Sequence, residues 1–215
     1  MKIGVFDSGK GGLSFVKAIN ESLPNNEIIF ASDTDHLPYG TKSPEEIYGY
    51  VLPILKDLES RGCKVIVVAC NTVSTTLINK LRPDFNIPLI AVEPMVKKAS
   101  EITRSGIVAV CATPTTLKSA RYKQLKELYA DNTSVLEPDC STWAEMVEGN
   151  RVDQEVIKKE IDEVIDQGAD VIVLGCTHYH WIEQLINEIS LDKAMVIQPE
   201  SSVIRQVKRV LSRLD

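Results

Sequence analysis

Short apolar runs alternate with amphipathic segments along nearly the whole chain. The apolar runs predict strands, because a run of about four to eight apolar residues suits a strand that is buried on both faces. The predicted strands are Ile3–Phe6, Ile28–Ala31, Val65–Ala69, Leu89–Val92, Ile107–Cys111, Ser134–Leu136, Val171–Gly175 and Met195–Ile197. Strands that alternate with helical patterns are typical of βα units, so we predict an α/β fold with largely parallel strands.

The amphipathic segments between the strands predict helices. The clearest start is Ser43-Pro44-Glu45-Glu46, where Ser43 and Glu46 can form a capping box and Pro44 suits the first helical position. Besides the helix that starts there, the predicted helices are Leu13–Leu23, Thr72–Leu81, Thr116–Tyr129, Val152–Gln167, Trp181–Ile189 and Ser201–Leu214.

Two segments about half a chain apart are similar. Residues 61–72 (RGCKVIVVACNT) and 167–178 (QGADVIVLGCTH) are identical at five of twelve positions, including Cys70 and Cys176. This repeat predicts two similar domains, residues 1–93 plus 191–215 and residues 94–190. Each cysteine follows a buried strand, at the carboxyl end where open α/β sheets bind ligands. If the two halves face one another, the two thiols face one another too.

Composition excludes several classes of protein. The 215 residues include 24 basic and 30 acidic side chains, and a net charge of −6 argues against a nucleic-acid-binding protein. The longest apolar run, Val65–Cys70, is too short to span a membrane. Asp7 interrupts any apolar region of a signal peptide, which predicts a cytoplasmic protein. The five cysteines lack framework spacing, so we expect free thiols.

Three interpretations of Cys70 and Cys176 are open on this evidence. Buried free cysteines commonly serve only as packing residues. A metal site with His178 is a second interpretation, although Cys-Thr-His lacks the usual spacing of zinc ligands. The third is acid/base chemistry, in which one thiolate and one thiol on opposite faces of a substrate carbon remove and return a proton. Such a pair inverts the carbon and needs no cofactor.

Other polar segments can complete a site. The turn Asp7-Ser8-Gly9-Lys10-Gly11-Gly12 follows a strand and precedes a helix, so its backbone N–H groups can hold a carboxylate, and Asp7 suits an ammonium group. It lacks the spacing of nucleotide-binding loops. Residues 33–40 form a polar loop that can line a site, in which we interpret His36 as a solvated residue. His178 is the better candidate for polarising a thiol. Trp143 and Trp181 are interpreted as packing residues.

Together, these motifs resemble the cofactor-independent glutamate racemases of the aspartate/glutamate racemase superfamily. The matching segments span almost the whole chain in the expected order: Gly4–Gly9 with Gly11-Gly12, Pro38–Gly40, Ala69–Thr72, Thr113–Thr116 with Ser119 and Tyr122, Val147-Glu148 and Gly175–Tyr179. The resemblance implies two α/β domains related by a pseudo-two-fold axis, with the substrate in the cleft between them. It also implies stereoinversion of glutamate with neither cofactor nor metal.

The resemblance implies roles for individual residues. Cys70 and Cys176 are the two acid/base residues, assisted by Asp7 and His178, with Asp33 and Glu148 as further polar supports. The residues implied in substrate binding are Asp7, Ser8, Tyr39, Gly40, Asn71, Thr72, Thr113, Thr177 and His178. Such enzymes supply D-glutamate for peptidoglycan in the bacterial cytoplasm. The expected partner is therefore a small molecule, with neither nucleic acid nor membrane, and a homodimer is compatible with the resemblance.

The sequence departs from the family pattern at Lys10, at His180 and at Cys140-Ser141, all near the expected cleft. These departures leave substrate preference open, so an aspartate racemase or another amino-acid racemase of the superfamily is the first alternative. A lyase or isomerase that uses a single cysteine is a second. A binding or regulatory protein that kept the fold and lost the chemistry is a third.

Overall fold

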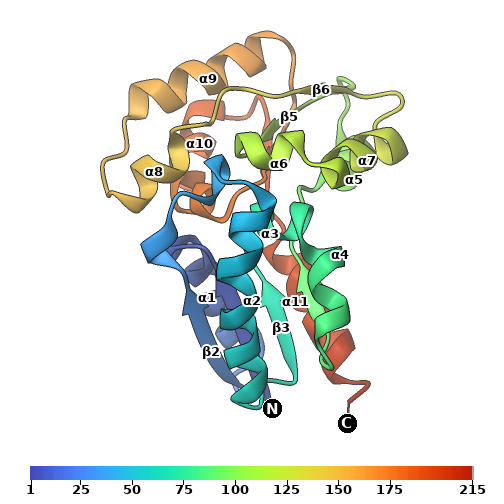
Figure 1. The fold of residues 1–215 in the computed structure, drawn as a ribbon. Coiled ribbons are helices and arrows are strands. Elements are labelled where there is room, and N and C mark those ends of the chain that lie inside the picture. The colour runs from blue at the N-terminus through green and yellow to red at the C-terminus, as the bar shows by residue number, and fades with distance from the viewer. Residues whose placement is uncertain (215) are drawn as a thin grey trace. The chain divides into compact units, whose positions relative to one another are not determined.

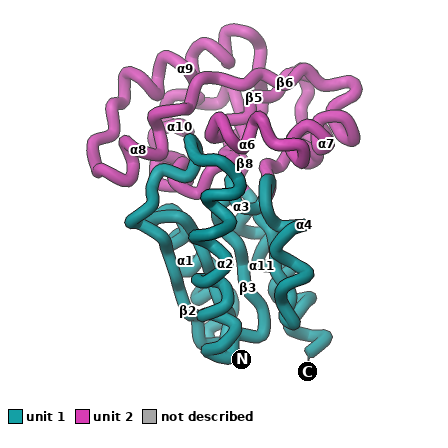
Figure 2. The backbone as a smooth tube through the Cα atoms, in the orientation of Figure 1, with its two compact units in different colours: residues 1–92, 199–215 teal, residues 93–198 magenta. Residues whose placement is uncertain are grey.

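The computed structural model describes residues 1–214, which form two compact units (Figure 2). Unit 1 is Met1–Val92 with Pro199–Asp215, and unit 2 is Glu93–Gln198. The chain therefore leaves unit 1 after Val92 and returns to it at Pro199. Each unit is an α/β structure with a four-stranded parallel sheet, which confirms the predicted fold class.

Unit 1 has the strand order β2-β1-β3-β4. The strands are β1 (Lys2–Asp7), β2 (Glu27–Ser32), β3 (Val65–Val68) and β4 (Leu89–Ala91). On one face, Ile3 and Val5 pack with apolar residues of α1 (Leu13–Ser22) and α11 (Glu200–Leu211). On the other face, Phe6 packs with α2 (Pro44–Ser60), α3 (Asn71–Thr76) and α4 (Ile78–Leu81). Successive residues of β1 therefore contribute to two cores, because side chains alternate across a strand.

Unit 2 repeats this order as β6-β5-β7-β8. The strands are β5 (Ile107–Cys111), β6 (Ser134–Leu136), β7 (Val171–Leu174) and β8 (Met195–Ile197). Its helices are α5 (Val96–Ile102), α6 (Pro114–Lys118), α7 (Ala120–Tyr129), α8 (Trp143–Glu148), α9 (Gln154–Asp166) and α10 (Glu183–Ser190) (Figure 1). Residues of α5 and α7 share one core with the sheet, and residues of α8, α9 and α10 share the other.

The predicted elements differ from the structure in four respects. Residues 191–198 belong to unit 2 rather than to the N-terminal half, because β8 pairs with β7. The segments 72–81 and 116–129 are each two helices, and α5 and α8 were not predicted. Trp143 is fully buried as expected, but Trp181 is 53% exposed, so its interpretation as a packing residue was wrong.

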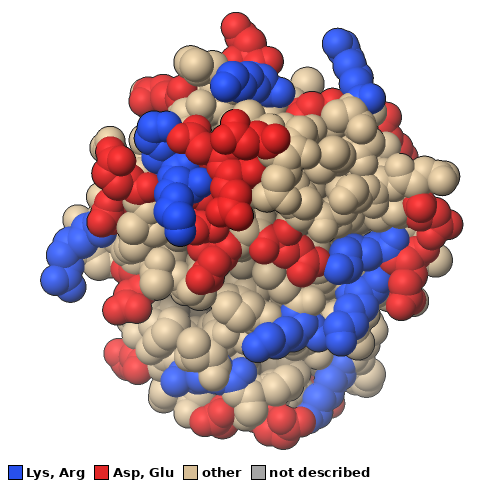
Figure 3. Space-filling view, turned by 90° about the horizontal axis from the view of Figure 1, so that it is seen from above, with Lys and Arg blue, Asp and Glu red and all other residues tan. Residues whose placement is uncertain are grey.

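The surface carries charges of both signs. On the face in Figure 3, Lys and Arg side chains lie beside Asp and Glu side chains rather than in a separate basic field. Among the described residues, no helix combines the length and the apolar character that crossing a membrane requires.

Candidate active site

In unit 1, the chemistry-bearing residues follow the carboxyl ends of neighbouring strands. Asp7 is the last residue of β1, and Cys70 lies two residues after β3 ends. Because β1 and β3 are parallel neighbours, these two ends share one edge of the sheet. Ser8 Oγ lies 3.5 Å from Cys70 Sγ. The structure thus brings Asp7, Ser8 and Cys70 into one cluster.

The glycine-rich turn after β1 holds the Asp7 carboxylate. Asp7 is fully buried, and its Oδ2 accepts hydrogen bonds from the backbone N–H of Gly9 at 3.3 Å and of Gly12 at 2.9 Å. A Cβ at position 12 would lie 2.5 Å from the Cβ of Asp7, so only glycine permits this approach. The turn therefore fixes a buried carboxylate beside the thiol.

The Cys70 thiol is buried, with 5% of the residue exposed. Burial and the negative charge of Asp7 raise its pKa from the usual 9.0 to about 11, against the opposing hydrogen bonds from Ser8 and from the backbone of Val73 and Thr72. Cys70 is therefore a thiol at neutral pH, the form that can donate a proton.

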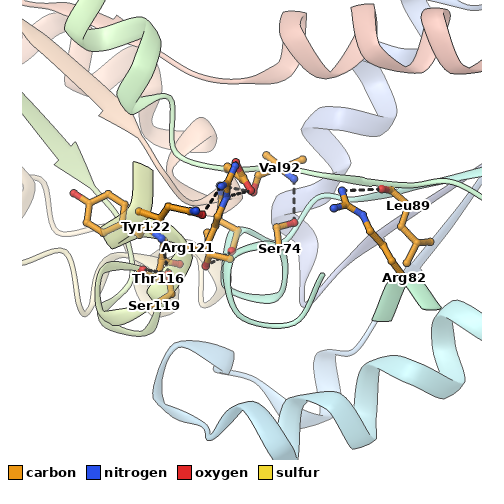
Figure 4. Close-up of polar contacts among 12 residues, drawn as sticks. Ser74, Arg82, Leu89, Val92, Thr116, Ser119, Arg121 and Tyr122 are labelled. Atoms are coloured by element: carbon orange, nitrogen blue, oxygen red, sulfur yellow. Dashed lines mark hydrogen bonds and ion pairs between the residues drawn. The ribbon is translucent and has the colours of Figure 1, made fainter. Parts of the chain in front are cut away.

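Cys70 precedes α3, whose first turn carries Asn71 and Thr72, both buried. Asn71 Nδ2 donates to the carbonyl of Val92 at 3.1 Å. The backbone N–H of Val92 donates to Ser74 Oγ at 3.0 Å (Figure 4). The Oδ1 of Asn71 is a buried acceptor that no group in residues 1–214 hydrogen-bonds. An ammonium group of a ligand can satisfy it.

A second polar cluster follows β2. Asp33 is 7% exposed, and its Oδ2 accepts a hydrogen bond from the hydroxyl of Tyr39 at 2.5 Å. Its Oδ1 lies 2.7 Å from His36 Nδ1. Gly40 follows Tyr39 in the short 3-10 segment Tyr39–Thr41. Burial and the hydrogen bond to Asp33 raise the pKa of Tyr39, so its hydroxyl stays protonated.

In unit 2, the counterpart of Cys70 lies beside a histidine and a carboxylate. Cys176 follows β7 and is 6% exposed, and its Sγ lies 3.8 Å from His178 Nδ1. His178 Nε2 lies 2.7 Å from Oε2 of Glu148, at the end of α8. A carboxylate only accepts, so Nε2–H donates to Glu148 and Nδ1 is left to accept a proton from the thiol. The structure thus brings Glu148, His178 and Cys176 into one relay.

Two threonines of unit 2 follow the same sheet edge as Cys176. Thr177 is buried and begins the 3-10 segment Thr177–Ile182. Thr113 caps α6, where its Oγ1 accepts from the backbone N–H of Thr116 at 3.4 Å and donates to the Thr116 hydroxyl at 3.0 Å. Both threonines follow strands of the same sheet, β7 and β5, which are parallel neighbours.

The metal interpretation of the cysteines gains no geometric support. Within residues 1–214, no group of three or more His, Cys, Asp and Glu side chains is arranged to hold a metal ion. In this part of the chain all five cysteines are buried free thiols.

His36 was interpreted from the sequence as a solvated residue, but the structure gives it a hydrogen bond to buried Asp33 and a stacked contact with Tyr50. Its side chain is still 44% exposed. The sequence held one signal, since His36 lies three residues from Asp33 in a polar loop. Nothing in the sequence could show that Tyr50 of α2 supports the ring.

Comparison with known proteins adds independent support for a racemase site. The sequence model of the Asp/Glu/hydantoin racemase family matches residues 3–207. The chain is 38% identical over 213 residues to a glutamate racemase of Methylococcus capsulatus, covering 97% of this chain and 79% of that protein.

Solved structures show the same fold. The glutamate racemase of Escherichia coli, in complex with L-glutamate and the activator UDP-MurNAc-Ala, matches with a TM-score of 0.89 at 28% identity, covering 98% of this chain and 82% of that chain. The enzyme of Francisella tularensis, in complex with D-glutamate, matches with a TM-score of 0.81 at 32% identity, covering 99% and 81%.

Proposed function

The chain belongs to the Asp/Glu/hydantoin racemase family, and we propose that it interconverts L- and D-glutamate without a cofactor. Its similarity to glutamate racemases, with 38% identity over 97% of the chain, makes it an isomerase that racemises amino acids. The observation that carries the proposal is the duplicated thiol: Cys70 and Cys176 follow equivalent strands, and each has its own polar neighbours. Packing alone does not explain why both thiols have such neighbours.

The proposed reaction is a proton transfer at the α-carbon. One thiolate removes the α-proton from one face, and the other thiol donates a proton to the opposite face. Cys176 is the thiol that can lose its proton to a neighbour, because His178 Nδ1 lies 3.8 Å away and Glu148 orients the ring. Cys70 is a thiol at neutral pH and supplies the second proton. The reverse reaction exchanges these roles.

The remaining polar residues would bind the two carboxylates and the ammonium group of glutamate. The Oδ1 of Asn71 and the carboxylate of Asp7 suit the ammonium group, because both are buried acceptors. We assign the carboxylates to backbone N–H groups and hydroxyls, which bind negative charge and would stabilise the carbanion between the two steps. For Ser8, Tyr39 and Thr113 the donor is the backbone N–H, because their hydroxyls already interact with Cys70, Asp33 and Thr116. The assigned residues are Ser8, Tyr39, Gly40, Thr72, Thr113 and Thr177. We place the activity in the bacterial cytoplasm, supplying D-glutamate for peptidoglycan.

The test is proton NMR of L- and D-glutamate in D2O with purified protein and no added cofactor. We expect loss of the α-proton signal, and loss of optical activity by circular dichroism. Turnover of aspartate with none of glutamate would make the chain an aspartate racemase instead. Unchanged glutamate and aspartate would contradict any racemase assignment among these two substrates.

Cysteine variants test the proposed mechanism. Cys70→Ser and Cys176→Ser should each fold and lose racemisation by about 10²-fold or more, because each removes one proton-transfer group. Each should keep some α-proton exchange with one enantiomer only. Cys63→Ala is the matched control. Cys63 is a buried thiol of the unit 1 core, and it belongs neither to the polar cluster of Asp7, Ser8 and Cys70 nor to the relay of Cys176. Near-normal racemisation in both serine variants would exclude two-base catalysis by these thiols.

A further inference from the structure

His36 ends a chain of hydrogen bonds that runs through Asp33 to the hydroxyl of Tyr39. It lies in the 3-10 segment Thr34–His36, between β2 and α2. Each oxygen of the Asp33 carboxylate is held by a different side chain: Oδ1 lies 2.7 Å from His36 Nδ1, and Oδ2 lies 2.5 Å from the Tyr39 hydroxyl. Asp33 is 7% exposed, so these two donors rather than water determine its orientation.

The inner end of this chain is the hydroxyl of Tyr39, a residue of the core that also contains Cys70. Tyr39 is 2% exposed and belongs to the same core cluster as Cys70. Burial and the hydrogen bond to Asp33 are the main causes of the raised pKa of Tyr39, and the charges of Asp7 and of an ionised Cys70 add to them. Because the Tyr39 hydroxyl keeps its proton and donates it to Asp33, the position of that carboxylate determines where the phenol points.

The outer end is held in place by a stacked ring. The rings of His36 and Tyr50 lie 3.8 Å apart between centroids, with 10° between their planes. Tyr50 is part of α2, which begins at a capping box and is therefore well anchored. The Asp33 carboxylate accepts only, so we assign the proton on His36 to Nδ1. The stack fixes the plane of the imidazole, and the hydrogen bond fixes its tautomer.

We propose that His36 is a positioning residue for the Cys70 side of the reaction, where it holds Asp33 in the orientation that fixes the hydroxyl of Tyr39, a residue of the same core cluster as Cys70. This inference rests on the function proposed above. None of the contacts described for His36 is to a thiol, so it acts through two intermediaries. When one of two donors to a buried carboxylate is removed, the carboxylate rotates and the remaining partner follows. A displacement of about 1 Å at a catalytic group is costly to the rate.

Three variants separate the hydrogen bond from the stacked contact. His36→Phe keeps a flat ring for Tyr50 and removes the donor, and we expect kcat/KM for glutamate to fall about tenfold. His36→Asn places an N–H donor near the position of Nδ1 and should restore kcat/KM to within about threefold of wild type. Asp35→Asn is the matched control, because Asp35 is an exposed neighbour in the same turn, and it should leave kcat/KM unchanged.

Isotope effects show which thiol is affected. L- and D-glutamate have equal free energy, so kcat/KM must fall equally in both directions and cannot identify the slowed step. The α-deuterium isotope effect on kcat/KM can identify the slowed step. It should rise for the enantiomer that Cys70 deprotonates and fall for the other, because only the Cys70 step becomes slower. Loss of folded enzyme would leave both isotope effects unchanged.

The outcomes separate this inference from the proposed function. A wild-type chain that racemises no glutamate overturns the proposed function and this inference with it. A wild-type chain that racemises glutamate, with kcat/KM unchanged in His36→Phe, overturns only the role of His36. So does a fall in kcat/KM that leaves both isotope effects at their wild-type values.

Discussion

Asp7 and Ser8 act on the Cys70 thiol in opposite directions. The charge of Asp7 raises the pKa of Cys70, whereas the hydrogen bond from Ser8 lowers it. Asp7→Asn keeps an acceptor for the backbone N–H groups and removes the charge, so the pKa of Cys70 should fall. Alkylation of Cys70 by uncharged iodoacetamide at pH 8, followed by mass spectrometry of its peptide, should become about tenfold faster.

Ser8→Ala is the opposite test, because it removes a hydrogen bond that favours the thiolate, and it should slow alkylation of Cys70 at the same pH. Equal alkylation rates in wild type and Asp7→Asn would show that the charge of Asp7 does not raise the pKa of the thiol.

The positions of residues that follow strands could be predicted one by one from the sequence. The surroundings of residues that depend on contacts between distant segments could not. Asp7, Cys70 and Cys176 stand at the ends of apolar runs, and parallel strands place such positions at one edge of a sheet. His36 stands in a loop, and its environment depends on the packing of α2 against β2. That packing brings Tyr50 to its ring, and sequence distance gives no measure of it.

At the scale of the element, the first turn of α9 depends on one side chain. Asp153 Oδ1 accepts from the backbone N–H groups of Glu155 at 3.0 Å and of Val156 at 3.4 Å. Asp153→Ala leaves both donors to water and should lower the free energy of unfolding by about 1 kcal/mol. Urea unfolding, monitored by circular dichroism, measures this free energy. Asp153→Asn keeps the cap and serves as the control, and equal losses in both variants would rule out this explanation.

The eight strands were predicted within one residue at each end, because an apolar run must end where the strand leaves the interior. The number and bounds of the helices were harder to predict. The apolar face continues across Ser119, but its hydroxyl accepts from the backbone N–H of Tyr122, so a second helix begins there. The helices α5 and α8 have seven and six residues, too few to repeat a 3.6-residue pattern convincingly.

At the scale of the whole molecule, each unit has its own interior. Among the described residues, every core cluster consists of residues from one unit only. Ile66 and Ile172 occupy equivalent positions of the repeat and are both fully buried. Each Ile→Ala change should cost about 2–5 kcal/mol, and mainly in its own unit.

Amide hydrogen exchange measures this directly. Ile172→Ala should speed exchange across β5–β8 more than across β1–β4, and Ile66→Ala should do the reverse. Equal acceleration of both sheets in both variants would mean that the two interiors open together.

The return of the chain to unit 1 also affects the order in which a ribosome delivers its parts. Val203, Val207 and Leu211 of α11 fill the face of the first sheet that α1 shares, yet they are synthesised after all of unit 2. Translation adds about 5–20 residues per second, so roughly 5–20 s pass between the synthesis of the first 92 residues and that of α11, which buries this face of the sheet. During translation unit 2 can be complete while unit 1 still exposes apolar surface, so the nascent chain is most open to chaperones and to aggregation at its earliest-made half.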